Sequence, residues 1–453
     1  MIYAKIKALR CILEGDNMKL FNTLSGKMEE FKPMKENEIN MYVCGPTVYS
    51  YAHVGNMCPV IIFDMVYRYF KYCGYNIKYA SNFTDVDDKI IKAAKEAGVT
   101  EKELTEKYIK IYLDDVKALN CLDIDYRPKV TETMDEIIDY IQLLMDKGYA
   151  YQSGDDVYFR VGKVKDYGKL SKQILNDLDA GNRVEIDENK ENPFDFVLWK
   201  KTKEGINWDS PFGKGRPGWH TECVVMINKL FGDNIDIHGG GVDLKFPHHE
   251  NEMAQSVAAT GTNLANYWMH NGHVMVNGVK MSKSLGNFIT AHELLEKYSA
   301  NVIRLSILKT SYRLPFDFTD QLFKECGTIN DKIYNALKQA NLIVQLRELE
   351  VGKLKQDNKI NEIMDEDFNT SNLITYLLEL IKDLNNKIRQ NEEFVEVYDK
   401  ITLINYILGL KYDFVSLNDD DKEIYNKWLE YRKNKDFENA DKLRNTLVER
   451  NIL

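Results

Sequence analysis

The segment that decides the fold of this chain is residues 38–56, EINMYVCGPTVYSYAHVGN. Apolar and polar residues alternate up to Cys44, and this alternation predicts a strand. Residues 56–72 then carry apolar side chains at helical spacing, and Gly74 ends the predicted helix. A second predicted strand follows at residues 75–80, YNIKYA. Strand, helix and strand in this order predict a right-handed βαβ unit of a parallel sheet.

Polar side chains follow both predicted strands. Cys44 and Thr47 come after the first strand, and Asn82, Thr84 and Asp85 come after the second. In parallel sheets of this kind, ligands bind at the carboxyl ends of the strands. The sequence therefore predicts a binding site at this edge of the sheet.

The rest of the chain divides into regions of different pattern. Between about residues 120 and 215 the sequence predicts helices and a β-hairpin, which we interpret as an insertion into the sheet domain. The sheet then resumes in residues 233–259, where a strand and a glycine turn precede a helix that we expect Pro247 to open. Residues 325–453 are helical and low in glycine. The predicted fold class is therefore an α/β parallel-sheet domain with an insertion, followed by an all-α domain.

The composition excludes several classes of protein. With 453 residues, 44% of them apolar, the chain is globular and fits about two to four domains. It has no run of 18 apolar residues and no signal-like start, so we expect a cytoplasmic protein without a membrane partner. Seven irregularly spaced cysteines argue against a disulfide framework. A net charge of -10 argues against a general nucleic-acid binder, although a local basic surface can still hold a phosphate backbone.

Four dispersed residues could form a metal site. His248 and Glu252 are four apart on a predicted helix, so their side chains share one face and could hold a divalent metal. Cys44 and Cys223 are the natural sulfur partners. The alternative is that both cysteines are small core residues and that the other two merely share a helix face. Spacing alone favours this alternative, because the four positions are too dispersed for a zinc signature.

A second candidate site contains two lysines on a loop. Asn277 and Gly278 form a strong hairpin signal, and Lys280 and Lys283 follow on the returning, serine-rich loop. Two such lysines are suited to neutralising a triphosphate as it loses pyrophosphate. A lone lysine pair is ordinarily solvated surface. The pair becomes more specific beside His53 at a helix start, where backbone N–H groups favour phosphate.

These motifs resemble the two signatures of class I aminoacyl-tRNA synthetases, namely PTVYSYAHVGN at residues 46–56 and KMSKS at residues 280–284. Further segments are similar to those of cysteinyl-tRNA synthetases in particular, and the similarity covers nearly the whole chain from Met18 onward. These segments are MYVCGP, NFTDVDDKI, GKGRPGWHTEC, DIHGGGVDLKFPHHENEMAQS and MDEDFNT.

The resemblance implies both a reaction and the residues that carry it out. The implied reaction is the ATP-dependent activation of L-cysteine to cysteinyl-adenylate and its transfer to the 3′ end of cysteine tRNA, by a monomer that uses Mg²⁺ with ATP. The implied ligands of one zinc ion per chain are Cys44, Cys223, His248 and Glu252. The residues implied for ATP binding and catalysis are His53, Asn56, Lys280, Lys283, Gly239, Gly240, Gly241 and Asp243. The residues implied for cysteine binding are Thr84, Trp219, His238, Gly45 and Thr47.

Zinc has a physical role in this implied reaction. A pocket that merely fits cysteine discriminates against serine by roughly 10- to 200-fold, because the two side chains differ by one small atom. A zinc ion prefers the ionised thiol, whereas a serine hydroxyl is a poor neutral ligand. The family accordingly needs no editing domain, and we identify no candidate for one in the sequence.

The resemblance also implies domain limits and shows three departures. We expect an N-terminal extension at 1–17, a Rossmann-type catalytic domain at 18–324, a helical tRNA-binding bundle at 325–415 and a small anticodon-proximal segment at 416–453. Asn56 replaces the second histidine of the general class I motif, and we expect its N–H group to do the same work on phosphate. The extension precedes the usual family start, and the chain ends at LVERNIL, where a further tail is expected.

Two alternative functions fit parts of the sequence. A related cysteine-activating ligase of mycothiol synthesis would share the zinc site, but it lacks a helical C-terminal domain. A non-catalytic, zinc-containing tRNA-binding relative is expected to have lost Lys280, Lys283 or His53, and all three are present.

Overall fold

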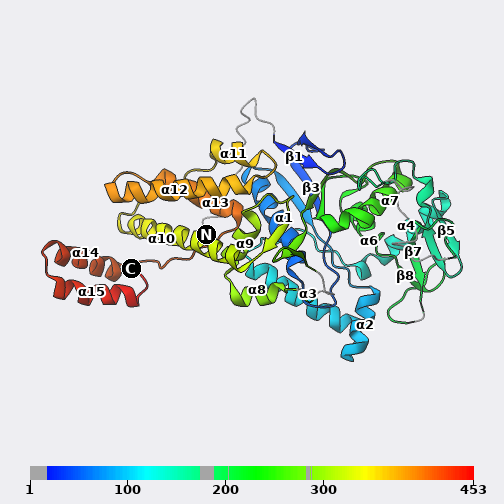
Figure 1. Cartoon of the computed structure of the whole chain (residues 1–453), viewed down its shortest axis with the longest axis horizontal. Coiled ribbons are helices and arrows are strands. Elements are labelled where there is room, and N and C mark those ends of the chain that lie inside the picture. Colours follow the sequence, from blue (N-terminus) through cyan, green and yellow to red (C-terminus); the bar gives the residue numbers. More distant parts are fainter. Residues whose placement is uncertain (1–17, 174–187, 203, 282–285, 287) are drawn as a thin grey trace.

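The structure is a computed structural model that describes residues 18–173, 188–202, 204–281, 286 and 288–453. The expected extension at 1–17 and Lys283 lie outside the described residues. Figure 1 shows an elongated molecule with its sheets toward one end and the last helices of the chain toward the other. Among the described residues, no helix combines the length and apolarity that a membrane span requires.

The sheet domain is built on four parallel strands, which lie in the order β10 (Ala265–Asn271), β9 (Ile235–Gly241), β3 (Glu38–Val43) and β4 (Asn76–Ala80). Strand β3 occupies an inner position, with Met41 opposite both Ile237 and Tyr79. The carboxyl ends of the four strands therefore meet at one edge. The predicted parallel α/β fold is confirmed.

Helix α1 (Val54–Tyr72) joins β3 to β4, as the sequence predicts. His53 stands at its N-cap, where the Asn56 side chain accepts a hydrogen bond from the His53 backbone N–H at 3.3 Å. Gly74 follows the last turn with a φ of 88°, a conformation that glycine adopts without strain.

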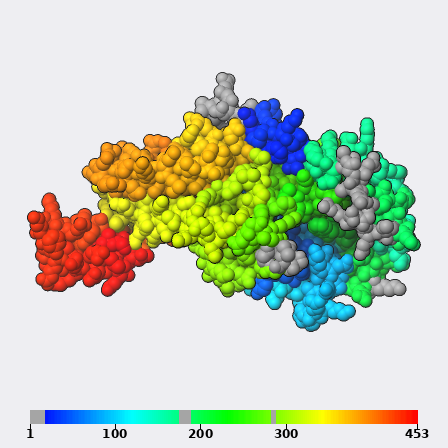
Figure 2. All heavy atoms as spheres, viewed as in Figure 1, coloured from blue at the N-terminus to red at the C-terminus, as the bar shows by residue number. Residues whose placement is uncertain are grey.

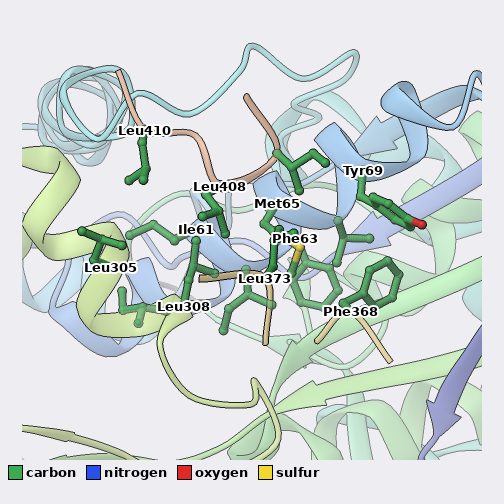
Figure 3. Close-up of a cluster of buried hydrophobic side chains, with 14 of the residues drawn as sticks. Ile61, Phe63, Met65, Tyr69, Leu305, Leu308, Phe368, Leu373, Leu408 and Leu410 are labelled. Carbon is green, nitrogen blue, oxygen red and sulfur yellow. The ribbon is translucent and has the colours of Figure 1, made fainter. Parts of the chain in front are cut away.

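The core on the α1 side of the sheet is continuous with the helical end of the chain. Figure 3 shows Ile61 and Met65 of α1 close to side chains that come from three later helices. These side chains are Leu305 and Leu308 of α9 (Ala300–Leu308), Leu373 of α12 (Thr370–Gln390) and Leu408 of α13 (Val395–Leu408). Helix α1 is buried on nearly all sides because it lies between the sheet and these helices.

A second core includes α6 (Glu222–Phe231) and α7 (Glu250–Thr260). The helical backbone that continues into α7 begins at Pro247, as the sequence predicts, because His249 and Glu250 after it have α-helical angles and the Glu250 N–H donates to the Pro247 carbonyl. Pro247 lies in a short helical segment, Lys245–His249, and α7 begins at Glu250. Phe246 before it has extended backbone angles (φ -140°, ψ 132°), so the chain turns there before the α-helix starts.

The predicted insertion contains helices and a second sheet. The hairpin β5–β6 is present as predicted, and the sheet gains two strands that the sequence pattern did not indicate. Helices α2 (Asp88–Ala97) and α3 (Glu101–Ala118) precede the insertion. Its elements are α4 (Met134–Asp146), β5 (Ala150–Ser153), β6 (Asp156–Phe159), β7 (Phe196–Lys201) and β8 (Gly215–Pro217).

The predicted Asn-Gly hairpin forms between β11 (Val274–Val276) and β12 (Val279–Lys280), and β11 also pairs with β13 (Phe316–Phe318). Asn277 and Gly278 have positive φ values of 51° and 76°, as this tight turn requires. After β13 the described chain is helical. Helices α10 (Asp320–Leu346) and α11 (Asn358–Met364) come first there, and α8 (Ala291–Lys297) lies before β13.

The chain ends in a helical hairpin, α14 (Asp419–Lys433) and α15 (Phe437–Glu449), which projects from the rest of the molecule in Figures 1 and 2. Trp428, Ala440 and Leu447 form its own small core. This core touches the bundle through Leu342 of α10.

The first described strand forms backbone hydrogen bonds with residues that lie far along the chain. Strand β1 (Lys19–Asn22) forms a hairpin with β2 (Lys27–Glu30). Its Lys19 N–H donates to the Asp365 carbonyl at 2.7 Å, and the Asp367 N–H donates back to the Lys19 carbonyl at 2.9 Å. The Asp367 side chain also accepts from the Phe21 N–H at 2.8 Å.

Candidate functional site

A cavity of about 440 Å³ opens at the carboxyl edge of the parallel sheet. It is lined by the end of β3, the start of α1, the ends of β9 and β10 and the β11–β12 hairpin. Of the predicted site residues, those that line it are Cys44, Gly45, Thr47, His53, Asn56, Trp219, Gly241, Asp243 and Lys280. Both sequence motifs, as far as the structure describes them, therefore face one cavity.

Cys44 stands at the wall of this cavity and is one of four clustered side chains, three of them buried, that could hold a metal ion. Its Sγ lies 3.5 Å from Cys223 Sγ and 3.6 Å from Glu252 Oε1. His248 Nε2 lies 3.9 Å from Cys223 Sγ and 2.9 Å from the same Glu252 oxygen. The four donor atoms all lie within 4.8 Å of one another.

The spacing of these donor atoms fits a zinc ion. A tetrahedral ion with bonds of about 2.0 to 2.3 Å holds its ligand atoms about 3.3 to 3.8 Å apart. The measured separations lie within a few tenths of an ångström of that range. Two thiols, one imidazole and one carboxylate form a donor set that binds zinc in preference to harder cations.

A second set of four residues shares two members with the first. Cys44 and Glu252 also lie with His238 and His249, and these donor atoms again fall within 4.8 Å of one another. His249 Nε2 is 3.3 Å from Cys44 Sγ, and His238 Nε2 is 2.8 Å from Glu252 Oε2. The set with Cys223 contains two thiols, so it is the better match to zinc.

Among the side chains of this cluster, the pKa values of Glu252 and Cys223 are shifted toward the forms that bind a metal. Burial alone would raise the pKa of Glu252, but His248 and His238 beside it hold that pKa well below its usual range. Burial raises the pKa of Cys44, whereas a hydrogen bond from Cys44 lowers the pKa of Cys223 to about 7. An ionised carboxylate and one readily ionised thiol are the protonation states that metal binding needs.

The residues expected to contact cysteine occupy different depths. Trp219 is 40% exposed at the cavity and stacks on His248, with ring centroids 4.1 Å apart. Thr84 and His238 lie deeper and do not line the cavity. The Thr84 hydroxyl donates to Glu222 at 2.7 Å, and His238 holds the Glu252 oxygen that faces away from the cysteines.

The glycines at the end of β9 have two different surroundings. A side chain at Gly239 would place its Cβ 2.2 Å from Phe63, and one at Gly240 would approach His249 to 2.9 Å. These two glycines therefore permit close packing inside the protein, whereas Gly241 and Asp243 line the cavity.

The comparisons with known proteins agree with this geometry. Residues 30–328 match the family model for the tRNA synthetases class I (C) catalytic domain, and residues 359–410 match the DALR domain. The cysteine–tRNA ligase of Shouchella clausii is 46% identical over 96% of this chain and 97% of its own length. The chain belongs to the cysteine–tRNA ligase family. A cysteine–tRNA ligase of Listeria monocytogenes is also 46% identical over 96% of this chain and 97% of its own length.

Solved structures of a more distant synthetase share the fold. Two structures of methionyl-tRNA synthetase from Mycobacterium tuberculosis with methionyl-adenylate align with TM-scores of 0.55 and 0.59, each at 15% identity. They cover 86% and 82% of this chain, and 84% and 90% of their own chains. At this identity the likeness concerns the class I fold alone.

Three histidines near the cluster in this member of the cysteine–tRNA ligase family were not predicted from the sequence, and two of them, His249 and His270, are buried. His249 Nδ1 lies 2.8 Å from His270 Nε2, and His220 Nδ1 lies 3.1 Å from His248 Nδ1. Their spacing along the chain gives no metal signature. Only the strand pairing of β9 with β10, which places His270 beside Gly240, brings His270 to this site.

Proposed function

We propose that this protein is an ATP-dependent cysteine–tRNA ligase, which activates L-cysteine to cysteinyl-adenylate and transfers it to cysteine tRNA. The observation that carries the proposal is the single cavity that joins Cys44 of the metal cluster to His53 and Lys280. A thiol-selecting group at one wall and phosphate-binding groups at another are what the reaction requires.

We propose that Cys44, Cys223, His248 and Glu252 hold one zinc ion. When bound, zinc supplies a soft Lewis acid that takes a thiolate as a further ligand and so selects cysteine over serine. His238 supports this site because it holds the second oxygen of Glu252 and fixes the orientation of the carboxylate.

The cavity wall orients the amino acid. Trp219, stacked on His248, covers the metal cluster and limits the size of the side chain that reaches it. Gly45 and Thr47 follow Cys44 and bring backbone groups to the same wall. The Gly45 N–H is already bound by Asn82 at 2.9 Å, which holds this segment in place.

The opposite wall receives ATP with its Mg²⁺. The N-terminus of α1 and His53 provide N–H groups and positive potential for the phosphates, and Lys280 adds a charge. A carboxylate oxygen of cysteine attacks the α-phosphorus and pyrophosphate leaves. Lys280 stabilises the negative charge that grows on the phosphates in this step. The ribose is placed at Asp243.

Transfer to tRNA completes the reaction. A hydroxyl at the 3′ end of tRNA attacks the carbonyl carbon of the adenylate, an ester forms and AMP leaves with the electron pair of the broken bond. We propose residues 18–324 as the catalytic domain, 325–415 as the tRNA-binding bundle and 416–453 as the anticodon-proximal segment of a monomer. Residue 325 falls within α10, so one long helix would span the first of these limits.

Two assays test this function. Purified protein should catalyse cysteine-dependent exchange between ATP and pyrophosphate, with serine giving no exchange at equal concentration. It should then charge cysteine tRNA. Exchange without charging, together with ligation of cysteine to an amino sugar, would indicate the mycothiol-type ligase instead. The absence of exchange in zinc-loaded protein would overturn the proposal.

A further inference from the structure

Two buried arginines connect the wall of the cavity with the helical end of the chain. Arg68 of α1 is 4% exposed and Arg304 of α9 is fully buried. Both donate to the same oxygen of Asp64, from Arg68 Nε at 2.8 Å and from Arg304 Nη2 at 2.6 Å. Asp64 lies on α1 and lines the cavity. One carboxylate thus faces two guanidinium groups, which leaves a surplus positive charge in a buried place.

The C-terminal end of α13 compensates this charge. Arg304 Nε donates to the Leu408 carbonyl at 2.7 Å, and Arg68 Nη1 donates to the Tyr406 carbonyl at 3.2 Å. These carbonyls belong to the last turn of α13, which carries the negative end of the helix dipole, and the Tyr406 carbonyl also accepts from the Gly409 N–H at 3.1 Å. Both arginines are therefore held between α1 and a helix in the region that matches the DALR domain.

Gly409, which caps α13, is packed against this contact. It has a φ of 67°, and a Cβ at this position would lie 2.2 Å from Arg304 Cζ. The Gly409 carbonyl also accepts from Asn120 Nδ2 at 2.7 Å, while the Asn120 carbonyl accepts from Arg68 Nη2 at 2.5 Å. Any side chain at position 409 must displace the guanidinium that holds Asp64.

We propose that the C-terminal end of α13 positions helix α1 in the catalytic cavity, through Arg304 and Asp64. Arg304 and Gly409 are positioning residues, since they act through Asp64 and do not line the cavity. Asp64 stands about three helical turns after His53 on the same helix. A shift of Asp64 therefore moves the phosphate-binding end of α1, and small misplacements of reacting groups cost large factors in rate.

This inference rests on the proposed function and deepens it. The proposed function links the helical bundle only to tRNA. Under this inference the bundle also supports the step that forms the adenylate. A contact that served only to join the two regions would affect stability and leave this step unchanged.

The test compares Gly409→Ala with a matched control, Gly98→Ala. Gly98 caps α2 with the same φ of 67°, but nothing lies within 4 Å of a Cβ there, so the control carries the backbone strain alone. Cysteine-dependent pyrophosphate exchange is measured well below the melting temperature of each variant. We expect kcat of Gly409→Ala to fall by about tenfold or more, with zinc content and KM for cysteine unchanged. We expect Gly98→Ala to stay within about twofold of the wild type.

The outcomes separate the two proposals. Equal exchange rates in Gly409→Ala and Gly98→Ala would overturn the positioning role, and an inactive wild type would overturn the proposed function itself. If Gly409→Ala does not fold, Asn120→Gly decides, because it removes the amide that holds the Gly409 carbonyl and keeps the positive φ of 57° accessible. A fall of about threefold or more in its kcat would support the proposal, and an unchanged kcat would overturn it.

Discussion

At the scale of single residues, Cys44 combines several structural roles in the site. It directly follows the inner strand β3, lines the cavity and belongs to both sets of side chains that could hold a metal ion. Its predicted role beside Cys223 could not follow from spacing, since the two cysteines lie far apart in the chain. Strand order brings the segment after β3 next to α6 and α7.

We expect Cys44→Ser to lose the metal. A serine hydroxyl does not ionise near neutral pH and is a poor zinc ligand, so dialysed protein should fall from about one zinc per chain to a small fraction of that. Zinc is measured by atomic emission, and cysteine-dependent exchange should disappear with it. Cys73→Ser, outside the cluster, serves as the control and should retain both. Full zinc content in Cys44→Ser would contradict the assigned ligand set.

Lys280 gives a second prediction at this scale. Lys280 lines the cavity in which we propose that pyrophosphate leaves, so Lys280→Ala should slow exchange by about 100-fold, with zinc content unchanged. The exposed Lys382 on α12 offers a control of the same charge, and Lys382→Ala should keep wild-type exchange. A normal rate in Lys280→Ala would remove this lysine from the phosphate site.

At the scale of elements, the α14–α15 hairpin has an uneven distribution of charge. Lys427 and Lys442 form ion pairs with Glu423 and Glu438 within their own helices. Near the turn between the helices, Lys433 and Lys435 have no ion pair among the residues that the structure describes. Phe437, 63% exposed, follows them. Free cations beside an exposed aromatic ring are typical of a surface that binds single-stranded nucleic acid.

We expect the double variant Lys433→Gln and Lys435→Gln to weaken tRNA charging without changing pyrophosphate exchange. Each lost phosphate contact should lower the slope of log affinity against log salt by about 0.7 to 0.9. The matched control is Lys427→Gln with Lys442→Gln, which removes the same charge from paired positions. Equal effects of the two double variants on charging would show that net charge, and not this turn, is responsible.

Some of these elements could be predicted from local sequence patterns, and others could not. The βαβ unit and the Asn-Gly hairpin were predicted because periodicity and turn chemistry are local properties. Strands β7 and β8 were missed, since their pairing depends on partners brought together by the insertion. Residue type and helix spacing made Cys223 and His248 candidate ligands, but only the resemblance favoured this role over that of core residues. The contact of Gly409 with Arg304 joins residues that no local pattern relates.

At the scale of the whole molecule, one core extends from the sheet into the helical bundle. Its members include Ile61 of α1 and Leu373 of α12, both fully buried. We therefore expect calorimetry to show one main unfolding transition for the sheet domain and bundle together. Leu373→Ala should cost about 2 to 5 kcal/mol and shift this whole transition downward.

A substitution of an exposed leucine serves as the control for Leu373→Ala. Leu429→Ala, on the projecting hairpin where Leu429 is 43% exposed, should change the main transition by less than about 0.5 kcal/mol. Two well-separated transitions in the wild type, with only one affected by Leu373→Ala, would show that the sheet domain and bundle unfold independently.

The pairing of β1 with residues 365–367 has a consequence for how the protein is made. Ribosomes add about 5 to 20 residues per second, so the partner of Lys19 is synthesised roughly 20 to 70 seconds after Lys19 itself. During that interval the outer edge of β1 is an open row of N–H and C=O groups that another nascent chain can pair with. Slower translation lengthens this exposure, which makes β1 the last of the described strands to be protected during biosynthesis.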